Sequence, residues 1–181
     1  MRYVKSLGLL AVAAAALVAF AGTASATTLT SPEGTTYTGE IKATSTNSEL
    51  HGAFVTVKCN HSELRGDVTS HGGAEVGAHI DQLTFTECNY PVTVTLNGTI
   101  SINGSNVVKS IGLTIDIHTS VGTCVFTTNS TVIGSLWEGI KAFFRMLLGK
   151  LPRTGGNFLC GSSGEWTGDY DLTTPNDLWV D

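Results

Sequence analysis

The sequence predicts an all-β fold, an antiparallel β-sandwich or a barrel-like structure, with two disulfides and at most one short helix. Apolar and polar residues alternate in several windows, which is the pattern of half-buried strands. The chain is rich in Thr and contains 21 Gly, residues that suit pleated strands and tight turns respectively. Its four cysteines are an even number. Short strands separated by turn signals are typical of sandwiches and barrels.

The N-terminus has the three parts of a secretory signal peptide. These parts are, in order, the charged Arg2 and Lys5, the apolar run Leu7–Ala21, and the small residues Ala24 and Ala26. A membrane span needs about 20 apolar residues, so the run is too short for an anchor. We therefore predict a signal peptide at 1–26 and a single β-rich domain at 27–181. The protein is expected to be secreted, either to the extracellular space or to the cell envelope.

The charge of the chain restricts its partners. The full chain has a formal net charge of −5, and removal of the leader makes it more acidic because two cations are lost. An acidic surface repels phosphate backbones, so we expect no nucleic-acid partner. No second apolar run approaches the length of a membrane span, and we do not expect contact with a membrane.

Strands and turns can be assigned along the chain from its local patterns. Alternation is clearest in three windows, where we predict strands: Pro91–Ile102, Ile111–His118 and Trp166–Leu172. Weaker strand patterns occupy four others: Tyr37–Ala43, Phe54–Cys59, Ala74–Thr86 and Cys124–Thr128. Hairpin turns are predicted at Gly72-Gly73 and Asn103-Gly104, because such pairs accept the backbone angles of tight turns.

The window Ile140–Leu151 has an ambiguous pattern. Its large apolar residues recur at intervals of three and four, as in an amphipathic helix, whereas a strand here would carry large apolar residues on both faces. Lys141 and Arg145 make it basic, and a basic amphipathic segment can lie on a membrane or dock on a partner. We favour packing against the sheet, with Phe144 and Leu148 in the core under either secondary structure.

Two disulfides are predicted from the cysteines and the leader. Cys59, Cys88, Cys124 and Cys160 follow a signal that directs the chain to an oxidising compartment. Four cysteines allow three pairings, and the sequence alone does not choose among them. We favour Cys59–Cys88 and Cys124–Cys160, because each pair then closes a loop within one half of the chain. The cysteine spacings do not fit a zinc knuckle.

The sequence lacks the common motifs of catalysis and cofactor binding. It contains no nucleophile elbow, no zinc-protease motif and no phosphate-binding loop. Five histidines could form a zinc or acid–base site only if folding brought them together: His51, His61, His71, His79 and His118. Glu165, Asp169 and Asp171 form an acidic group without the spacing of a calcium loop. We therefore assign no catalytic, cofactor-binding or metal-binding residue and expect no cofactor.

Several segments carry a resemblance to a known group of proteins. They are Leu83–Cys88, Lys150–Cys160, Trp166–Tyr170 and Thr174–Val180. These segments resemble uncharacterised secreted β-rich proteins encoded by actinobacteria. The resemblance implies an all-β domain with a strand before the last cysteine, and it therefore favours a strand in Ile140–Leu151. The group has no assigned activity, so the resemblance implies no site residues.

Taken with the leader, these features favour a secreted, non-catalytic β-domain that binds an envelope glycan or a protein partner. One alternative is a small secreted hydrolase, which would need histidines and carboxylates gathered in one pocket. Another is a membrane-active protein that uses Ile140–Leu151. A pocket lined by polar side chains would favour catalysis, whereas an aromatic patch facing solvent would favour binding.

The predicted processing can be tested by mass spectrometry. The exported protein should begin at Thr27, and its intact mass should equal that of residues 27–181 less four hydrogens for two disulfides. An exported product that retains the leader would contradict the signal-peptide prediction.

Overall fold

A computed structural model gives the fold of the chain and describes residues 26–120 and 122–181. The predicted signal peptide lies outside the described residues, apart from its last residue, Ala26. The chain forms an eight-stranded antiparallel barrel with extra strands and two disulfides, so the predicted all-β fold is confirmed. The one helical turn in the described part, η1 (Phe158–Cys160), has three residues and offers no candidate for a membrane span.

Fourteen strands are formed in the described residues. In chain order they are β1 (Leu29–Thr30), β2 (Glu40–Ser45), β3 (Ser48–His51), β4 (Thr56–Ser70), β5 (Glu75–Cys88), β6 (Val92–Leu96), β7 (Thr99–Asn103), β8 (Val107–Ile111), β9 (Thr114–Thr119), β10 (Gly122–Thr127), β11 (Thr131–Trp137), β12 (Phe143–Gly155), β13 (Ser163–Thr174) and β14 (Trp179–Val180). The turns predicted at Gly72-Gly73 and Asn103-Gly104 join the antiparallel pairs β4–β5 and β7–β8.

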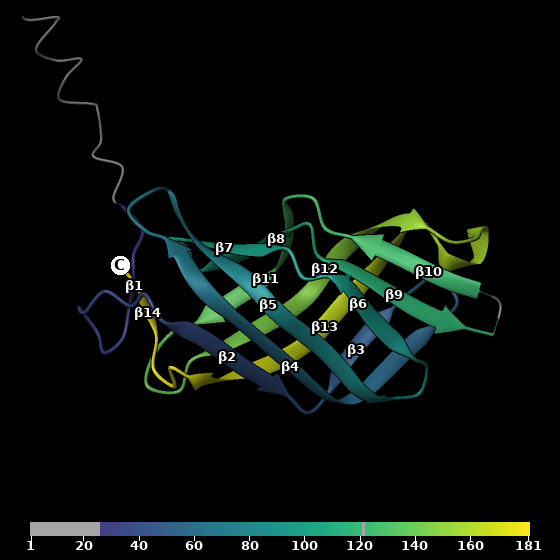
Figure 1. The fold of residues 1–181 in the computed structure, drawn as a ribbon, viewed down its shortest axis with the longest axis horizontal. Helices are drawn as coiled ribbons and strands as arrows, with labels where there is room; N and C mark the ends of the chain where they lie inside the picture. Colours follow the sequence, from purple (N-terminus) through teal and green to yellow (C-terminus); the bar gives the residue numbers. More distant parts are fainter. Residues whose placement is uncertain (1–25, 121) are drawn as a thin grey trace, which may run out of the picture.

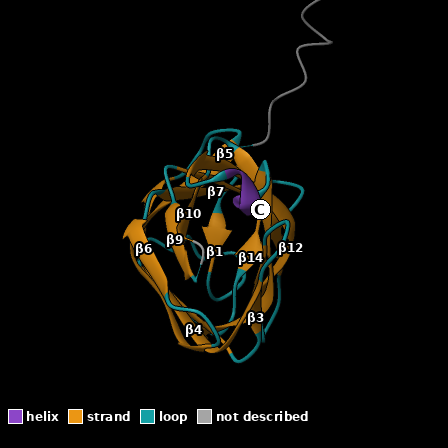
Figure 2. Ribbon diagram, turned by 90° about the vertical axis from the view of Figure 1, so that its right-hand side faces the viewer, coloured by secondary structure: helices purple, strands orange, loops and turns teal. Residues whose placement is uncertain are grey.

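Four long strands, β4, β5, β12 and β13, run along the barrel and are shared by its two halves (Figure 1). In one half they join β2, β7, β8 and β11 in a closed ring, because β2 pairs with both β13 and β4. In the other half they meet β3 and the three-stranded sheet β10–β9–β6. There β6 lies beside β5, with no ladder between the two strands in the described residues. Figure 2 looks along the barrel from this second half.

The first described residues and the C-terminus lie side by side at the end of the barrel formed by the first half (Figure 1). Strand β1 pairs with β14, with Leu29 opposite Val180. The backbones of Thr28 and Asp181 exchange two hydrogen bonds, of 2.7 and 2.9 Å. The hydroxyl of Thr30 also donates to the Asp181 carboxylate, 2.9 Å away. Leu29 is fully buried, so this small sheet covers the end of the core.

The interior of the barrel is filled by large side chains. Trp166 lies at its centre and makes edge-to-face contacts with Phe85 and Tyr170, with ring centroids 5.7 and 5.6 Å apart. Phe126 and Phe144 are also fully buried. Each aromatic side chain of this kind buries about 150–250 Å² of surface, and aliphatic side chains fill the rest of the interior.

Two buried serine hydroxyls contact the phenolic oxygen of Tyr170. Ser48 Oγ donates to Tyr170 Oη at 3.0 Å, and Ser62 Oγ lies 2.7 Å from the same oxygen. All three residues are buried. Burial raises the pKa of Tyr170 to about 12, although the two serine hydrogen bonds act in the opposite direction. The phenol is therefore held in its neutral form.

Two windows that were predicted as single strands are each divided by a glycine. Pro91–Ile102 forms β6 and β7, which are separated at Gly98. Gly98 has φ of 69°, and a Cβ there would lie 2.3 Å from the carbonyl oxygen of Ile111, so only glycine fits. Ile111–His118 is likewise divided between β8 and β9 at Gly112, where φ is 75°. The alternation of apolar and polar residues continues through Gly98 and Gly112 in the sequence, so the pattern gave no sign that the strands end there.

The ambiguous window Ile140–Leu151 forms the turn before β12 and most of that strand, so the strand preference is confirmed. Phe144 is buried with 1% of its surface exposed, whereas Leu147 is 57% exposed on the outer face. A bulge between Met146 and Gly149 shifts the alternation. The helix-like spacing combines core residues such as Phe144 and Leu151 with exposed residues such as Ile140 and Leu147. The predicted burial of Leu148 falls outside the described side chains.

Replacing Phe144 should test the role of β12 in the core. Phe144→Ala removes a buried ring and should lower the free energy of unfolding by about 3–5 kcal/mol, a large part of the roughly 5–15 kcal/mol typical of a domain. Leu147→Ala is the matched control on the same strand and should change the free energy of unfolding by less than about 1 kcal/mol. Urea denaturation measures both. Equal effects of the two changes would contradict the assigned faces of β12.

Replacing Tyr170 should change how stability depends on pH. Tyr170→Phe leaves the two serines without their shared partner and should cost about 1–3 kcal/mol at neutral pH. In the wild type, stability from the neutral phenol is complete below pH 10 and is lost as pH rises towards the folded-state pKa of about 12. The difference in free energy of unfolding between the wild type and Tyr170→Phe, measured by urea denaturation, should therefore become smaller above pH 10. A difference that stays constant as the pH rises would contradict this expectation.

Candidate functional site

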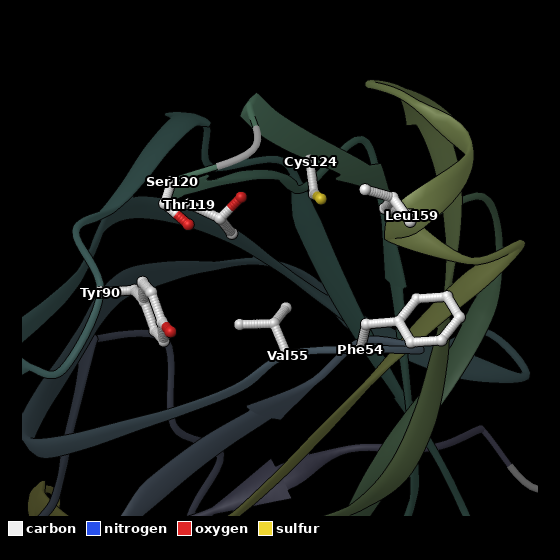
Figure 3. Close-up of a pocket in the computed structure, with 7 residues that line it drawn as sticks. All are labelled: Phe54, Val55, Tyr90, Thr119, Ser120, Cys124 and Leu159. Atoms are coloured by element: carbon white, nitrogen blue, oxygen red, sulfur yellow. The ribbon is translucent and has the colours of Figure 1, made fainter.

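A pocket opens at the end of the barrel that lies opposite the β1–β14 sheet (Figure 3). Its volume is about 300 Å³, at the lower limit of small-molecule sites in proteins. Seven residues line this mouth pocket: Phe54, Val55, Tyr90, Thr119, Ser120, Cys124 and Leu159. The mouth of a β-barrel is a common place for a ligand.

The lining comes from four separate connections and from two strands, with Thr119 at the end of β9 and Cys124 in β10. Phe54 and Val55 lie in the β3–β4 turn, which is held by a 2.7 Å hydrogen bond from the Gly52 amide to the Val55 carbonyl. Tyr90 follows β5, Ser120 lies between β9 and β10, and Leu159 lies in η1. In Figure 3, Val55 and Tyr90 lie across the pocket from the hydroxyls of Thr119 and Ser120 and from the sulfur of Cys124.

The Tyr90 side of the pocket is positioned by the preceding asparagine. The Asn89 side chain accepts a 2.8 Å hydrogen bond from the Lys58 amide and donates one of 3.1 Å to the Thr56 carbonyl. The Asn89 amide also donates to the Lys58 carbonyl. The short β5–β6 connection is thereby attached to β4, and Tyr90 is held at the edge of the pocket.

Both disulfides lie at this end of the barrel and have the predicted pairing. Cys59–Cys88 joins β4 to β5 directly before the Tyr90 connection, and Cys124–Cys160 joins β10 to η1. The two bridges span 29 and 36 residues, for which the chain-entropy estimate is about 3–4 kcal/mol each. Cys59–Cys88 cross-links a register pair of the β4–β5 ladder, whereas Cys124–Cys160 attaches η1, which lies outside the strand ladders. Disulfides of this kind indicate an oxidising, non-cytoplasmic compartment.

The mouth pocket offers apolar surface and a few hydroxyls. The described residues that line it include no Asp, Glu, His, Lys or Arg. The Thr119 hydroxyl donates to the Gly122 carbonyl at 2.7 Å, which places it in the β9–β10 hairpin. General acid–base catalysis requires a positioned ionisable group near neutral pH. The pocket is therefore better suited to binding an uncharged, largely apolar molecule than to hydrolysis.

The rim of the pocket exposes aromatic surface to solvent. Phe54 is 77% exposed and lines the pocket, while Phe158 on η1 is 80% exposed and lies outside its lining. Exposed rings at the edge of an apolar pocket are typical of binding sites, because solvent contact at these positions costs free energy until a ligand covers them. Phe54 is thus an aromatic residue of the lining that a ligand can reach from solvent.

The histidines singled out in the sequence occupy separate elements of the fold. His51 lies on β3 and contacts Glu49 at 3.1 Å, and His79 on β5 lies 3.9 Å from Asp81. His118 on β9 contacts the hydroxyls of Thr93 and Thr123. His61 lies on β4, and His71 lies in the β4–β5 turn. Within residues 26–120 and 122–181, no three His, Cys, Asp or Glu side chains are grouped so that they could hold a metal ion.

The acidic group Glu165, Asp169 and Asp171 lies on the outer face of β13 rather than at the mouth. Asp169 forms an ion pair with Arg145 on β12, with Nε and Oδ1 2.9 Å apart. Glu165 lies opposite His51 of β3 in the strand register. These carboxylates therefore belong to the wall of the barrel.

The sequence did not reveal the mouth pocket. Cys124 was assigned only to a disulfide, and the remaining lining residues carried no functional assignment. They are distant in sequence and lie mostly in connections, where periodicity gives no signal. The pairing of the cysteines was the one usable clue, because it predicts which connections are held together.

Comparisons with protein-family models, with curated proteins and with solved structures each gave no match. The function of the chain has therefore to be inferred from its own geometry.

Proposed function

We propose that the chain is a secreted, non-catalytic binding domain that takes up a small, uncharged, largely apolar ligand at the mouth of its barrel. The observation that carries the proposal is the mouth pocket of about 300 Å³, lined by Phe54, Val55, Tyr90 and Leu159 with hydroxyls on one side. The two disulfides hold this end of the barrel together. A preformed pocket lowers the conformational cost of binding.

Secretion is supported by two independent features. The first 26 residues have the charged, apolar and small-residue parts of a signal peptide. The disulfides require an oxidising environment to form and persist. A secreted domain with a small apolar pocket suits binding outside the cell or in its envelope.

The two alternatives receive less support from the geometry. A hydrolase would need acid–base groups, and the described lining of the mouth pocket has none. A membrane-active segment at Ile140–Leu151 would need its apolar residues at the surface, whereas β12 places Phe144, Met146 and Leu151 in the core. These three residues thus stabilise the barrel, whereas Ile140 and Leu147 are exposed.

Binding at the mouth can be tested with the neutral fluorophore N-phenyl-1-naphthylamine, whose emission rises in apolar surroundings. The mature, disulfide-bonded protein should give a saturable increase with one site per chain. Phe54→Ala removes an aromatic wall of the pocket and should weaken binding about tenfold, the equivalent of roughly 1.4 kcal/mol.

Phe158→Ala is the matched control, because Phe158 is as exposed as Phe54 but lies outside the lining. It should leave the dissociation constant within about twofold of the wild type. Absence of saturable binding, or equal losses in the two variants, would overturn the proposal. Melting temperatures of both variants show whether the barrel is intact.

A further inference from the structure

The outer wall of the barrel carries a patch of aromatic and charged side chains. We define the wall patch as Trp137 of β11, Phe143 and Arg145 of β12, and Asp169 and Asp171 of β13. The register places Trp137 opposite Phe143, Phe143 opposite Asp171, and Arg145 opposite Asp169. The residues that alternate with them on these strands are buried, so the wall patch faces outward.

The side chains of the wall patch hold one another in place. The rings of Trp137 and Phe143 stack with centroids 5.6 Å apart and planes inclined by 11°. The Arg145 guanidinium carbon lies 5.0 and 5.2 Å from the two ring centroids. Arg145 also makes two hydrogen bonds to Asp169, of 2.9 and 3.3 Å, and its pKa is raised by this carboxylate. The patch is therefore preorganised before any partner binds.

A polar hollow adjoins the wall patch. It has a volume of about 550 Å³ and is lined in part by Thr46, Asn47, Thr167, Asp169 and Asp171. It lies where the wall is interrupted, because the chain leaves β2 at Ser45 and begins β3 at Ser48. The hollow thus presents hydroxyl, amide and carboxylate groups directly beside the aromatic stack.

This combination matches the chemistry of a sugar. Trp137 remains 51% exposed although it belongs to a stack, so part of its apolar ring surface is open to solvent. A pyranose has an apolar C–H face that can cover such a ring and a rim of hydroxyls that pair with carboxylates and amides. Asp169, Asp171 and the nearby Glu138 outnumber Arg145 and Lys141, so polyanions are disfavoured by charge.

We infer that the wall patch and the adjoining hollow bind a neutral glycan of extended, β-1,4-linked pyranose units. Sugar rings stack on Trp137. The hydroxyls of the glycan accept hydrogen bonds from Asn47 and Arg145 and donate hydrogen bonds to Asp169 and Asp171. An extended chain suits the site because the patch and the hollow follow one another along the wall. The inference concerns a second surface and does not rest on ligand binding at the mouth.

Isothermal titration of the mature, disulfide-bonded protein with cellohexaose and chitohexaose tests the inference. At least one of these neutral hexasaccharides should bind, while the anionic polymer polygalacturonate should not. Trp137→Ala should weaken the hexasaccharide binding at least about tenfold. Asp171→Asn keeps the size of the side chain but removes an acceptor, and it should weaken binding about threefold or more.

Ile140→Ala is the matched control, because Ile140 is 76% exposed near the same strands but outside the wall patch. It should leave hexasaccharide binding within about twofold. Failure of both hexasaccharides to bind at millimolar concentration, stronger binding of polygalacturonate, or equal effects of Trp137→Ala and Ile140→Ala would overturn the inference. Naphthylamine binding by Trp137→Ala should be unchanged, so failure at the wall is distinguishable from failure at the mouth.

Discussion

Closure of the sheet around one apolar interior is the constraint on which the rest of the structure depends. An open sheet of this length would leave unpaired edges. Closure removes them in the half of the barrel that contains β2, and in the other half it brings β6 beside β5 without a ladder in the described residues. The long strands β4, β5, β12 and β13 must pair with different partners in each half of the barrel. Strand β12, for example, pairs with β11 near Phe144 and with β10 near Arg153. The bulge after Met146 adjusts the alternation of β12 so that it contributes to the core in both halves.

A closed and filled barrel leaves binding to its ends and its outer surface. Trp166, Tyr170 and Phe126 occupy the interior, so a ligand has no room among them. One end is covered by the β1–β14 sheet, and the other is bordered by connections rather than by paired strands. Those connections can form a pocket only if something else holds them. Cys124–Cys160 holds η1, Cys59–Cys88 links β4 to β5 directly before the Tyr90 connection, and the hydrogen bonds of Asn89 attach that connection to β4. The same bridges that stabilise the fold therefore shape the mouth pocket.

The sequence predicted the fold class because alternation reports which residues face the core. The favoured disulfide pairing is the one observed, although the sequence alone did not choose among the three possible pairings. It did not predict the divisions at Gly98 and Gly112, because apolar residues continue in phase on either side of each turn. The helix-like spacing of Ile140–Leu151 arises because this segment carries apolar residues both in the core and on the surface, which only the pairing with β11 and β13 reveals.

Both surfaces proposed for binding were invisible in the sequence for a related reason. Phe54, Tyr90 and Leu159 come together through three separate connections. Trp137 and Arg145 become neighbours only through the register of β11 with β12. The pairing of β1 with β14 has a consequence for how such surfaces are presented, since both chain ends leave the barrel on the side away from the mouth (Figure 1). A molecule immobilised through either end would point its pocket into the surrounding medium, and joining the two ends would give a circular chain with the same barrel.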